Sequence, residues 1–216
     1  MIMKISLING SQKTGESNTK LILERLQSLI NQSHEINIYN CGLKQLTDEM
    51  FDKIISDDVI ILMFPLFVHS LPSNTLRMLI ELENNIKRQQ KKDLIIYTIV
   101  NNGFYEGKQN NIAFEIIQNW CEQTGVKFGG GIGQGAGEML GRTKDLPKNR
   151  DLFKNLTCAL QTMTENIKTK QPMEIQYLSP NFPRFLWRFM GVRNWNNMAK
   201  NNGLSKKDIS AALSTT

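Results

Sequence analysis

The sequence predicts a doubly wound α/β fold with a five-stranded parallel sheet, followed by a C-terminal extension. Short apolar runs alternate along the chain with segments of helical periodicity, and the chain opens with a strand, a Gly-rich turn and a helix. The central runs Val59–Phe64 and Leu94–Val100 are apolar throughout, which is typical of strands covered on both faces. Alternating strands and helices predict a parallel sheet between two helical layers.

The first half of the chain supplies two strands and two helices. Lys4–Ile8 reads as a short buried strand, and Asn18–Ile30 has apolar residues at the 3 and 4 spacing of an amphipathic helix. Glu35–Tyr39 is the second expected strand. Thr47 can cap a helix over Asp48–Ser56, because its hydroxyl can accept a hydrogen bond from the first helical turn.

The second half continues the alternation from the third strand, Val59–Phe64, which ends at Pro65. The remaining expected strands are 94–100 and 127–132, and the remaining expected helices are 74–87, 110–124 and 148–167. We therefore expect one domain over residues 1–170 and an extension over residues 171–216.

Composition limits the class of protein. The longest apolar run, Val59–Val68, is about half as long as a membrane-spanning helix. The opening segment before Asn9 is too short for the core of a signal peptide, so we expect a cytoplasmic location.

Cysteine and histidine are too few and too scattered for several kinds of site. The three cysteines, Cys41, Cys121 and Cys158, lie far apart and form no CxxC pair, so neither a disulfide framework nor a zinc site is expected. Only His34 and His69 are available for a metal site or a Ser/His/Asp triad. We therefore expect no metal site and give hydrolase chemistry little weight.

Basic charge is concentrated near the C-terminus. Residues 1–140 hold 13 basic and 15 acidic side chains, a balance of −2. Residues 141–216 hold 13 basic and 5 acidic side chains, a balance of +8. The C-terminal third therefore carries the net charge of +6.

Four loops are expected to form the ligand site. In doubly wound sheets, ligands bind outside the carboxyl ends of the strands, where the strand order reverses. The loops that follow the expected strands are rich in Gly, Asn, Ser or aromatic residues: Gly10–Asn18, Pro65–Asn74, Asn101–Lys108 and Gly133–Gly141.

The first loop, GSQKTGESNT, suits a single phosphate. It lacks the GxGxxG pattern of dinucleotide-binding proteins, and Glu16 replaces the lysine of the triphosphate pattern GxxxxGK[ST]. Its hydroxyls and backbone N–H groups at a helix N-terminus can hold a monophosphate. The alternative is a purely structural loop in which Ser17 only caps the helix.

Three motifs in order resemble those of the flavodoxin-like NAD(P)H-dependent FMN reductases. GSQKTGESNT resembles the phosphate loop of that family, with Lys13 at an arginine position. PLFVHSLPSNTLRMLIE resembles the second loop and helix, with Phe67 where tyrosine is commoner and Arg77 where lysine is commoner. NNGFYEGKQNN and GGGIGQGAGEM resemble the third loop and the last strand. The resemblance covers residues 1–142.

This resemblance implies that the chain binds FMN. Three groups of residues would hold it. The phosphate group comprises Ser11, Lys13, Ser17, Asn18 and Thr19; the ring group comprises Pro65, Leu66, Phe67, Val68 and His69; and Asn101, Asn102, Gly103 and Phe104 would face the pyrimidine edge. Simple core burial of Phe67 and Val68 is the alternative for those two residues. For His69, the alternative is that it is an ordinary loop residue without a role in binding.

The implied activity is electron transfer from NAD(P)H through FMN to a small-molecule acceptor such as a quinone, a nitro or azo compound, free flavin or a metal ion. The cofactor carries the chemistry, so no catalytic side chain is named. A homodimer is expected. Some relatives hold an iron–sulfur centre on a cysteine cluster, but only Cys41 stands there in this chain. The alternatives are a flavodoxin-type electron carrier, or a scaffold that binds a membrane or a partner.

The extension combines aromatic and basic residues in NFPRFLWRFMGVRNWNNMAK. Phe185, Phe189 and Val192 align at helical spacing, while Pro180, Pro183 and Gly191 are expected to prevent a long helix. The segment could lie on an anionic membrane, cover the flavin of a partner subunit, or pack on its own domain. No nucleic-acid-binding motif is present in the sequence.

Overall fold

The computed structural model describes residues 2–30, 34–91, 93–143, 152–205 and 208. Two compact units divide the chain, Met1–Pro180 and Asn181–Thr216, and each is described by itself. The division falls ten residues beyond the expected end of the domain at residue 170. The reason is a short strand, Gln176–Leu178, which belongs to the sheet of the first unit.

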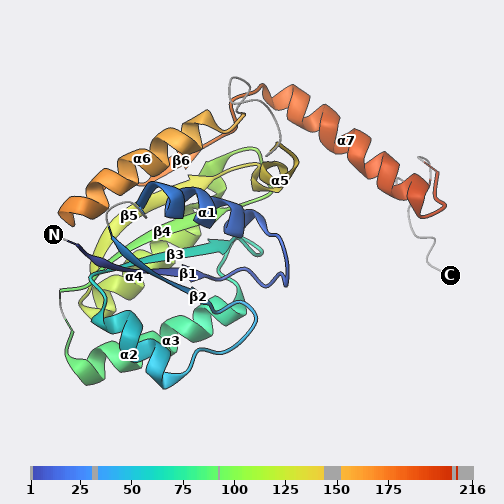
Figure 1. Ribbon diagram of the computed structural model, residues 1–216. Coiled ribbons are helices and arrows are strands. Elements are labelled where there is room, and N and C mark those ends of the chain that lie inside the picture. The colour runs from blue at the N-terminus through green and yellow to red at the C-terminus, as the bar shows by residue number, and fades with distance from the viewer. Residues whose placement is uncertain (1, 31–33, 92, 144–151, 206–207, 209–216) are drawn as a thin grey trace. The chain divides into compact units, whose positions relative to one another are not determined.

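The sheet described in the first unit has six parallel strands in the order β2-β1-β3-β4-β5-β6 (Figure 1). The first five confirm the expected strands and extend several of them by one or two residues: β1 Lys4–Asn9, β2 Glu35–Asn40, β3 Val59–Pro65, β4 Ile95–Asn101 and β5 Lys127–Gln134. The sixth, β6, pairs with Ile132–Gln134 of β5. The expected number of five strands was therefore one too low. A strand of three half-buried residues is too short to show an alternation of apolar and polar residues in the sequence.

The helices follow the predicted order. Their bounds are α1 Asn18–Ile30, α2 Asp48–Ser56, α3 Ser73–Gln89, α4 Asn111–Thr124, α5 Leu140–Thr143 and α6 Lys154–Thr169, with 3₁₀ turns η1 Gly107–Asn110 and η2 Gly137–Met139. Thr47 caps α2 as predicted, and its hydroxyl accepts from the Met50 N–H at 3.4 Å. The expected start of the last helix at Lys148 lies outside the described residues.

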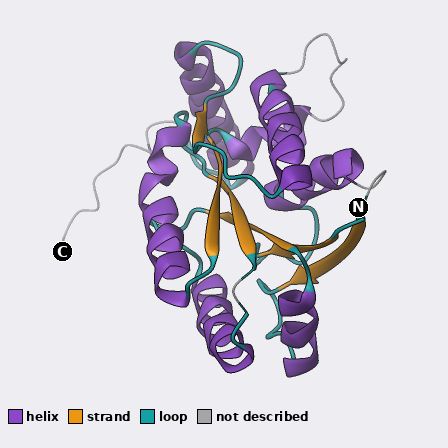
Figure 2. Ribbon diagram, turned by 90° about the vertical axis from the view of Figure 1, so that its left-hand side faces the viewer, coloured by secondary structure: helices purple, strands orange, loops and turns teal. Residues whose placement is uncertain are grey.

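Two helical layers enclose the sheet (Figures 1 and 2). Apolar side chains of α1 and α6, such as Leu26 and Leu160, pack with the sheet residues Leu7 and Tyr97 on one face. Those of α2, α3 and α4 pack on the other face with residues such as Phe64. The chain thus has the predicted doubly wound arrangement.

Tyr97 fastens the end of α6 to the middle of the sheet. Its side chain is fully buried in β4, and its hydroxyl lies 2.6 Å from the Gln171 carbonyl oxygen and 3.1 Å from that of Asn166. Burial raises the pKa of this phenol, so the hydroxyl keeps its proton and remains a donor. The Asn166 carbonyl lies in the last turn of α6, and the Gln171 carbonyl lies two residues beyond the end of the helix.

The second unit contains one described helix, α7 Arg184–Asn201. The expectation that Pro180, Pro183 and Gly191 would prevent a long helix was wrong. Pro183 stands at the N-cap, where no helical N–H is required, and a single interior glycine costs only about 1 kcal/mol. None of the described helices is both long and apolar enough to cross a membrane.

Replacing Tyr97 with Phe is expected to lower the free energy of unfolding by about 1 kcal/mol, because the hydrogen bond to the Gln171 carbonyl is lost while the ring stays packed. Urea denaturation measures this change. Tyr177→Phe is the matched control, because that half-buried hydroxyl has no hydrogen-bond partner among the described residues. Equal stability of Tyr97→Phe and the wild type would contradict the assigned role.

Candidate functional site

The candidate site lies where the chain reverses direction across the sheet. The chain passes from β1 outward to β2 and then returns to β3 on the other side of β1, so the carboxyl ends of β1 and β3 border the switch point. The loops after β1, β3, β4 and β5 leave this same edge of the sheet. All four loops selected from the sequence are therefore brought to one edge.

The loop after β1 approaches the neighbouring elements closely. The Gly10 N–H donates to the Met63 carbonyl at 2.7 Å, and a Cβ at Gly10 would stand only 2.4 Å from Thr75 Oγ1. The Ser11 N–H donates to Asn9 Oδ1 at 3.0 Å, which fixes the first turn of the loop. Ser11 is buried as a result, although it is a serine in a loop.

Ser17 caps α1. Its Oγ accepts from the Lys20 N–H at 3.1 Å, and its carbonyl accepts from the Leu21 N–H at 3.0 Å. The N–H groups of Asn18 and Thr19 have no acceptor among the described residues. The first turn of α1 has no acidic residue either, so the positive end of this helix is not neutralised by its own side chains.

A buried hydrogen bond joins the first loop to the third. Thr19 Oγ1 donates to Asn101 Oδ1 at 2.8 Å, between the start of α1 and the end of β4. The Asn101 carbonyl in turn accepts from the Leu66 N–H at 2.8 Å, in the loop after β3. Asn101 therefore connects three of the four loops, a role that its position at a strand end did not reveal.

The loop after β3 forms a tight turn with strained backbone. Phe67 and Ser70 exchange N–H to carbonyl hydrogen bonds of 2.9 and 2.8 Å across Val68 and His69. Both central residues have positive φ, 47° for Val68 and 62° for His69. Positive φ is unfavourable for a β-branched residue, so the hydrogen-bonded ends of the turn must hold Val68 in place.

This turn presents apolar side chains to solvent. Val68 is 95% exposed and Phe67 is 45% exposed, so the alternative of core burial for these two residues was wrong. The His69 ring stacks on the Phe104 ring from the next loop, with centroids 5.4 Å apart and planes inclined by 18°. The ring group and the edge group named from the sequence thus meet, while Pro65 and Leu66 are half-buried beneath them.

The loops after β4 and β5 are fastened to each other by main-chain hydrogen bonds. The Asn102 N–H donates to the Gln134 carbonyl at 2.9 Å, and the Gly137 N–H donates to the Asn102 carbonyl at 2.7 Å. The side-chain oxygens of Asn102 and Gln134 are buried and have no hydrogen-bond partner among the described residues. Unpaired buried acceptors are costly, and they mark a place where a ligand donor would be stabilising.

Several residues at this edge were not predicted. Thr75 Oγ1 is buried beside Gly10, and Gln134 ends β5, just before a loop for which no binding residue was proposed. Glu138 Oε2 would be 3.6 Å from a Cβ at Gly103. Only contacts between residues far apart in the chain bring these side chains to this edge of the sheet, and no local sequence pattern indicates their position.

The charged residues of the first loop point away from the buried part of the site. Lys13 and Glu16 are both exposed, whereas Ser11, Ser17 and Thr19 are buried. The carboxylate of Glu16 therefore does not share the buried environment of the hydroxyls. The expectation that it would face solvent agrees with this exposure.

The buried cysteines are poorly suited to redox or metal chemistry. Burial raises the pKa of the Cys41 thiol to about 11 and that of Cys121 to about 12, so both stay protonated at neutral pH. Within the described ranges, no group of three His, Cys, Asp or Glu side chains could hold a metal ion.

A separate pocket of about 120 Å³ lies beside the predicted site, between α2, α3 and the loop after β2. Its lining includes Cys41, Lys44, Phe51, Asn74 and Arg77. None of the residues predicted to bind a cofactor is among those lining it.

Solved structures with the same fold are known. An NADH:FMN oxidoreductase (EMOB) in its apo form matches 76% of this chain and 89% of its own, with a TM-score of 0.58 and 14% identity. A flavodoxin, WrbA-like protein from Agrobacterium tumefaciens matches 78% and 99%, with a TM-score of 0.55 and 9% identity. The rubredoxin oxygen:oxidoreductase of Desulfovibrio gigas matches 77% of this chain but only 36% of its own, with a TM-score of 0.53 and 14% identity.

No protein-family model and no curated protein matches the sequence. The structural similarities confirm the predicted fold, which is flavodoxin-like with a sixth strand and a C-terminal unit. At these identities they establish the fold alone.

Changing Val68 to Asn is expected to raise the free energy of unfolding by about 1 kcal/mol, because Asn tolerates positive φ better than a β-branched residue does. Thermal and urea denaturation measure the gain. Ile80→Asn serves as a control, because it removes an exposed β-branched side chain from ordinary helical backbone of α3 and should bring no gain. A loss of stability in Val68→Asn would show that the turn is not strained.

Proposed function

We propose that the protein is an FMN-dependent oxidoreductase that passes electrons from NAD(P)H through bound FMN to a small acceptor. The observation that carries the proposal is the pair of N–H groups at the start of α1, those of Asn18 and Thr19, which have no acceptor among the described residues and lie near the buried residues Ser11 and Ser17. The flavodoxin-like fold and the flavin-linked names of the similar structures add support.

The first loop suits the terminal phosphate of FMN. The unpaired N–H groups of Asn18 and Thr19 can donate to phosphate oxygens, and the helix end favours negative charge. The oxygens of Ser11 and Ser17 accept main-chain hydrogen bonds, which leaves their own protons available to a phosphate. Lys13 can approach from the solvent side. The loop thus offers several neutral hydrogen-bond donors but only one cation, Lys13, and this set suits a monophosphate better than a triphosphate.

The next two loops suit a flat ring system. The exposed faces of Phe67 and the stacked pair His69 and Phe104 offer aromatic surface, and aromatic stacking contributes about 0.5–1.5 kcal/mol per ring pair. The unpaired Asn102 Oδ1 can accept from a ring N–H at the pyrimidine edge. Asn101 is occupied by Thr19, so we assign it the role of holding these loops together rather than of contacting the ring.

Bound FMN would supply the capacity to take up and release two electrons, and the chain would supply position and environment. The Thr19 to Asn101 hydrogen bond holds the phosphate loop at a constant distance from the ring loops. The hydrogen-bonded turn at Phe67–Ser70 keeps its aromatic residues at the surface, where a second substrate can reach them. A homodimer, a cytoplasmic location and a small-molecule acceptor belong to the same proposal.

An electron carrier of the flavodoxin type is the main alternative. Such carriers tend to be strongly acidic, whereas the residues of the first unit comprise 20 basic and 19 acidic side chains. The near balance of charge favours an enzyme that binds small substrates. It does not provide the acidic surface that a carrier would present to basic redox partners.

Ser11→Ala is expected to raise the dissociation constant of FMN about tenfold or more, because a hydrogen bond to a charged oxygen is lost. Quenching of flavin fluorescence on titration into the purified protein measures it. Ser28→Ala, at the exposed far end of α1, is the matched control and should leave binding unchanged. Wild-type protein that neither retains nor binds FMN would refute the proposed cofactor.

Glu16→Gln tests the orientation of the same loop. With the exposed carboxylate neutralised, FMN binding should stay unchanged or become tighter, since like-charge repulsion with the phosphate disappears. A large loss of affinity would mean that the loop presents a different side to the ligand.

Anaerobic addition of NADH or NADPH to the FMN-loaded protein is expected to bleach the visible absorbance of the flavin. Free FMN at the same concentration is the control for uncatalysed reduction. Bleaching by one nucleotide at much lower concentration than the other would identify the preferred donor. If neither nucleotide bleaches the bound flavin faster than free FMN, the chain is a carrier rather than this enzyme.

A further inference from the structure

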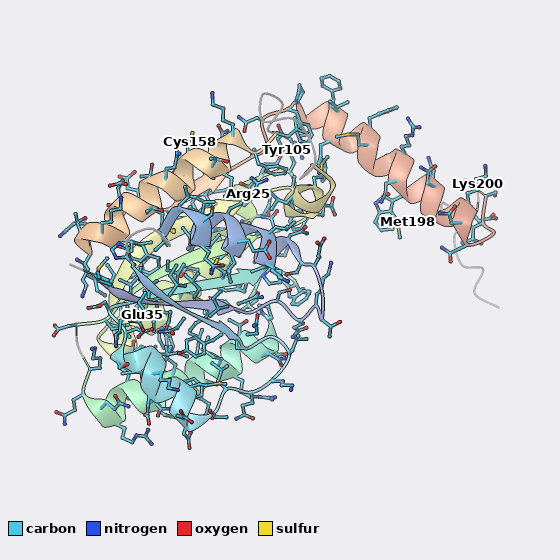
Figure 3. All side chains as sticks on the ribbon, in the orientation of Figure 1. Arg25, Glu35, Tyr105, Cys158, Met198 and Lys200 are labelled. Carbon is cyan, nitrogen blue, oxygen red and sulfur yellow. The ribbon has the colours of Figure 1, made fainter. Side chains whose placement is uncertain are left out.

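The pocket between α2, α3 and the segment after β2 has an apolar floor. Helices α2 and α3 pack side by side on the same face of the sheet (Figures 1 and 3). The buried residues that line the pocket are all apolar: Cys41, Leu46, Phe51 and Met78. A ligand that enters it would therefore remove apolar surface from water on several sides.

The rim of the pocket is polar and carries more positive than negative charge. Lys44 and Arg77 are exposed and Glu81 is half-buried, so two cations and one carboxylate give a balance of +1. No ion pair of these three side chains is found among the described residues. Asn74, in the first turn of α3, also lines the pocket, and this turn has no acidic residue. The positive end of the helix therefore adds to the charge of the rim, which favours an anion.

Hydrogen bonds hold one wall of the pocket in place. The Cys41 N–H donates to the Asn9 carbonyl at 3.0 Å, and Asn74 Nδ2 donates to the Gly42 carbonyl at 2.6 Å. Gly42 also lies so close to the main chain of Ser11 that a Cβ at Gly42 would overlap the Ser11 carbonyl oxygen. The pocket is therefore formed before a ligand arrives, which lowers the entropic cost of binding.

We infer that this pocket binds a small aromatic carboxylate. An apolar cavity of about 150 Å³ accepts benzene. The pocket of about 120 Å³ is open at its rim, so it suits a single six-membered ring whose substituent is directed outward. The ring would contact Phe51 and Met78, both of which pack favourably against aromatic partners. The carboxylate would accept hydrogen bonds from Arg77 and Lys44.

Size and charge separate this ligand from other occupants. The three fused rings of a flavin are too large for about 120 Å³, and none of the lining residues belongs to the site proposed for FMN. A cationic ring would meet two cations and one carboxylate at the rim. An inorganic anion would leave the apolar floor in contact with water.

The methyl signals of isotopically labelled methionine in the full-length protein test the inference by nuclear magnetic resonance. Met78 lines the pocket, whereas Met163 lies in α6 and packs on the opposite face of the sheet. Benzoate should shift the Met78 signal saturably, with a dissociation constant on the order of 1 mM, and should leave the Met163 signal in place. Met78→Leu and Met163→Leu assign the two signals. The shift should appear both with and without added FMN.

Arg77→Gln with Lys44→Gln should weaken benzoate binding about tenfold or more, because the carboxylate loses its charged donors. Lys53→Gln with Lys87→Gln is the matched control. It removes two exposed cations from α2 and α3 outside the pocket, and it should leave binding unchanged. Glu81→Gln should tighten binding about twofold, since a like charge beside the carboxylate disappears.

Unaltered positions of the other methionine signals show that each variant is folded. The inference would be overturned by the absence of a saturable Met78 shift in the wild type, or by equal affinity of Arg77→Gln with Lys44→Gln. Tighter binding of benzylamine or of hexanoate than of benzoate would overturn the assigned ligand class. Displacement of benzoate by FMN would also overturn the inference, because it would place benzoate in the flavin site. A protein that binds no FMN leaves these outcomes unaffected.

Discussion

Burial of the central strands on both faces is the constraint on which the rest of the structure depends. Every residue from Val59 to Phe64 is buried, and so is every residue of β4. A strand of this kind is stable only with helices on both sides of the sheet, which requires crossover connections and parallel pairing. The crossovers reverse direction once, between β1 and β3, and this reversal creates the edge where the four loops meet.

The loops at that edge are held by hydrogen bonds rather than by apolar packing. Thr19 and Asn101 join the first and third loops, and Asn102 joins the third to the fourth through Gln134 and Gly137. Such bonds leave the outer surface of the loops free for a ligand. Within the part of the chain that the structure describes, they also leave several polar groups without a partner, including Asn102 Oδ1 and the first N–H groups of α1.

The two units differ in net charge and in the residues that they expose. The first unit has almost no net charge and carries the candidate cofactor site, while the second concentrates positive charge beside exposed aromatic residues.

The sequence alone determined the alternation of five strands and their helices, because each of these elements carries its own period of apolar residues over five or more positions. It also determined which loops gather at one edge, since parallel strands share the direction of their carboxyl ends. Only the tertiary structure decided the sixth strand, the exposure of Phe67 and Val68, and the partnership of Thr19 with Asn101. These features depend on contacts between residues far apart in the chain, and no local pattern specifies them.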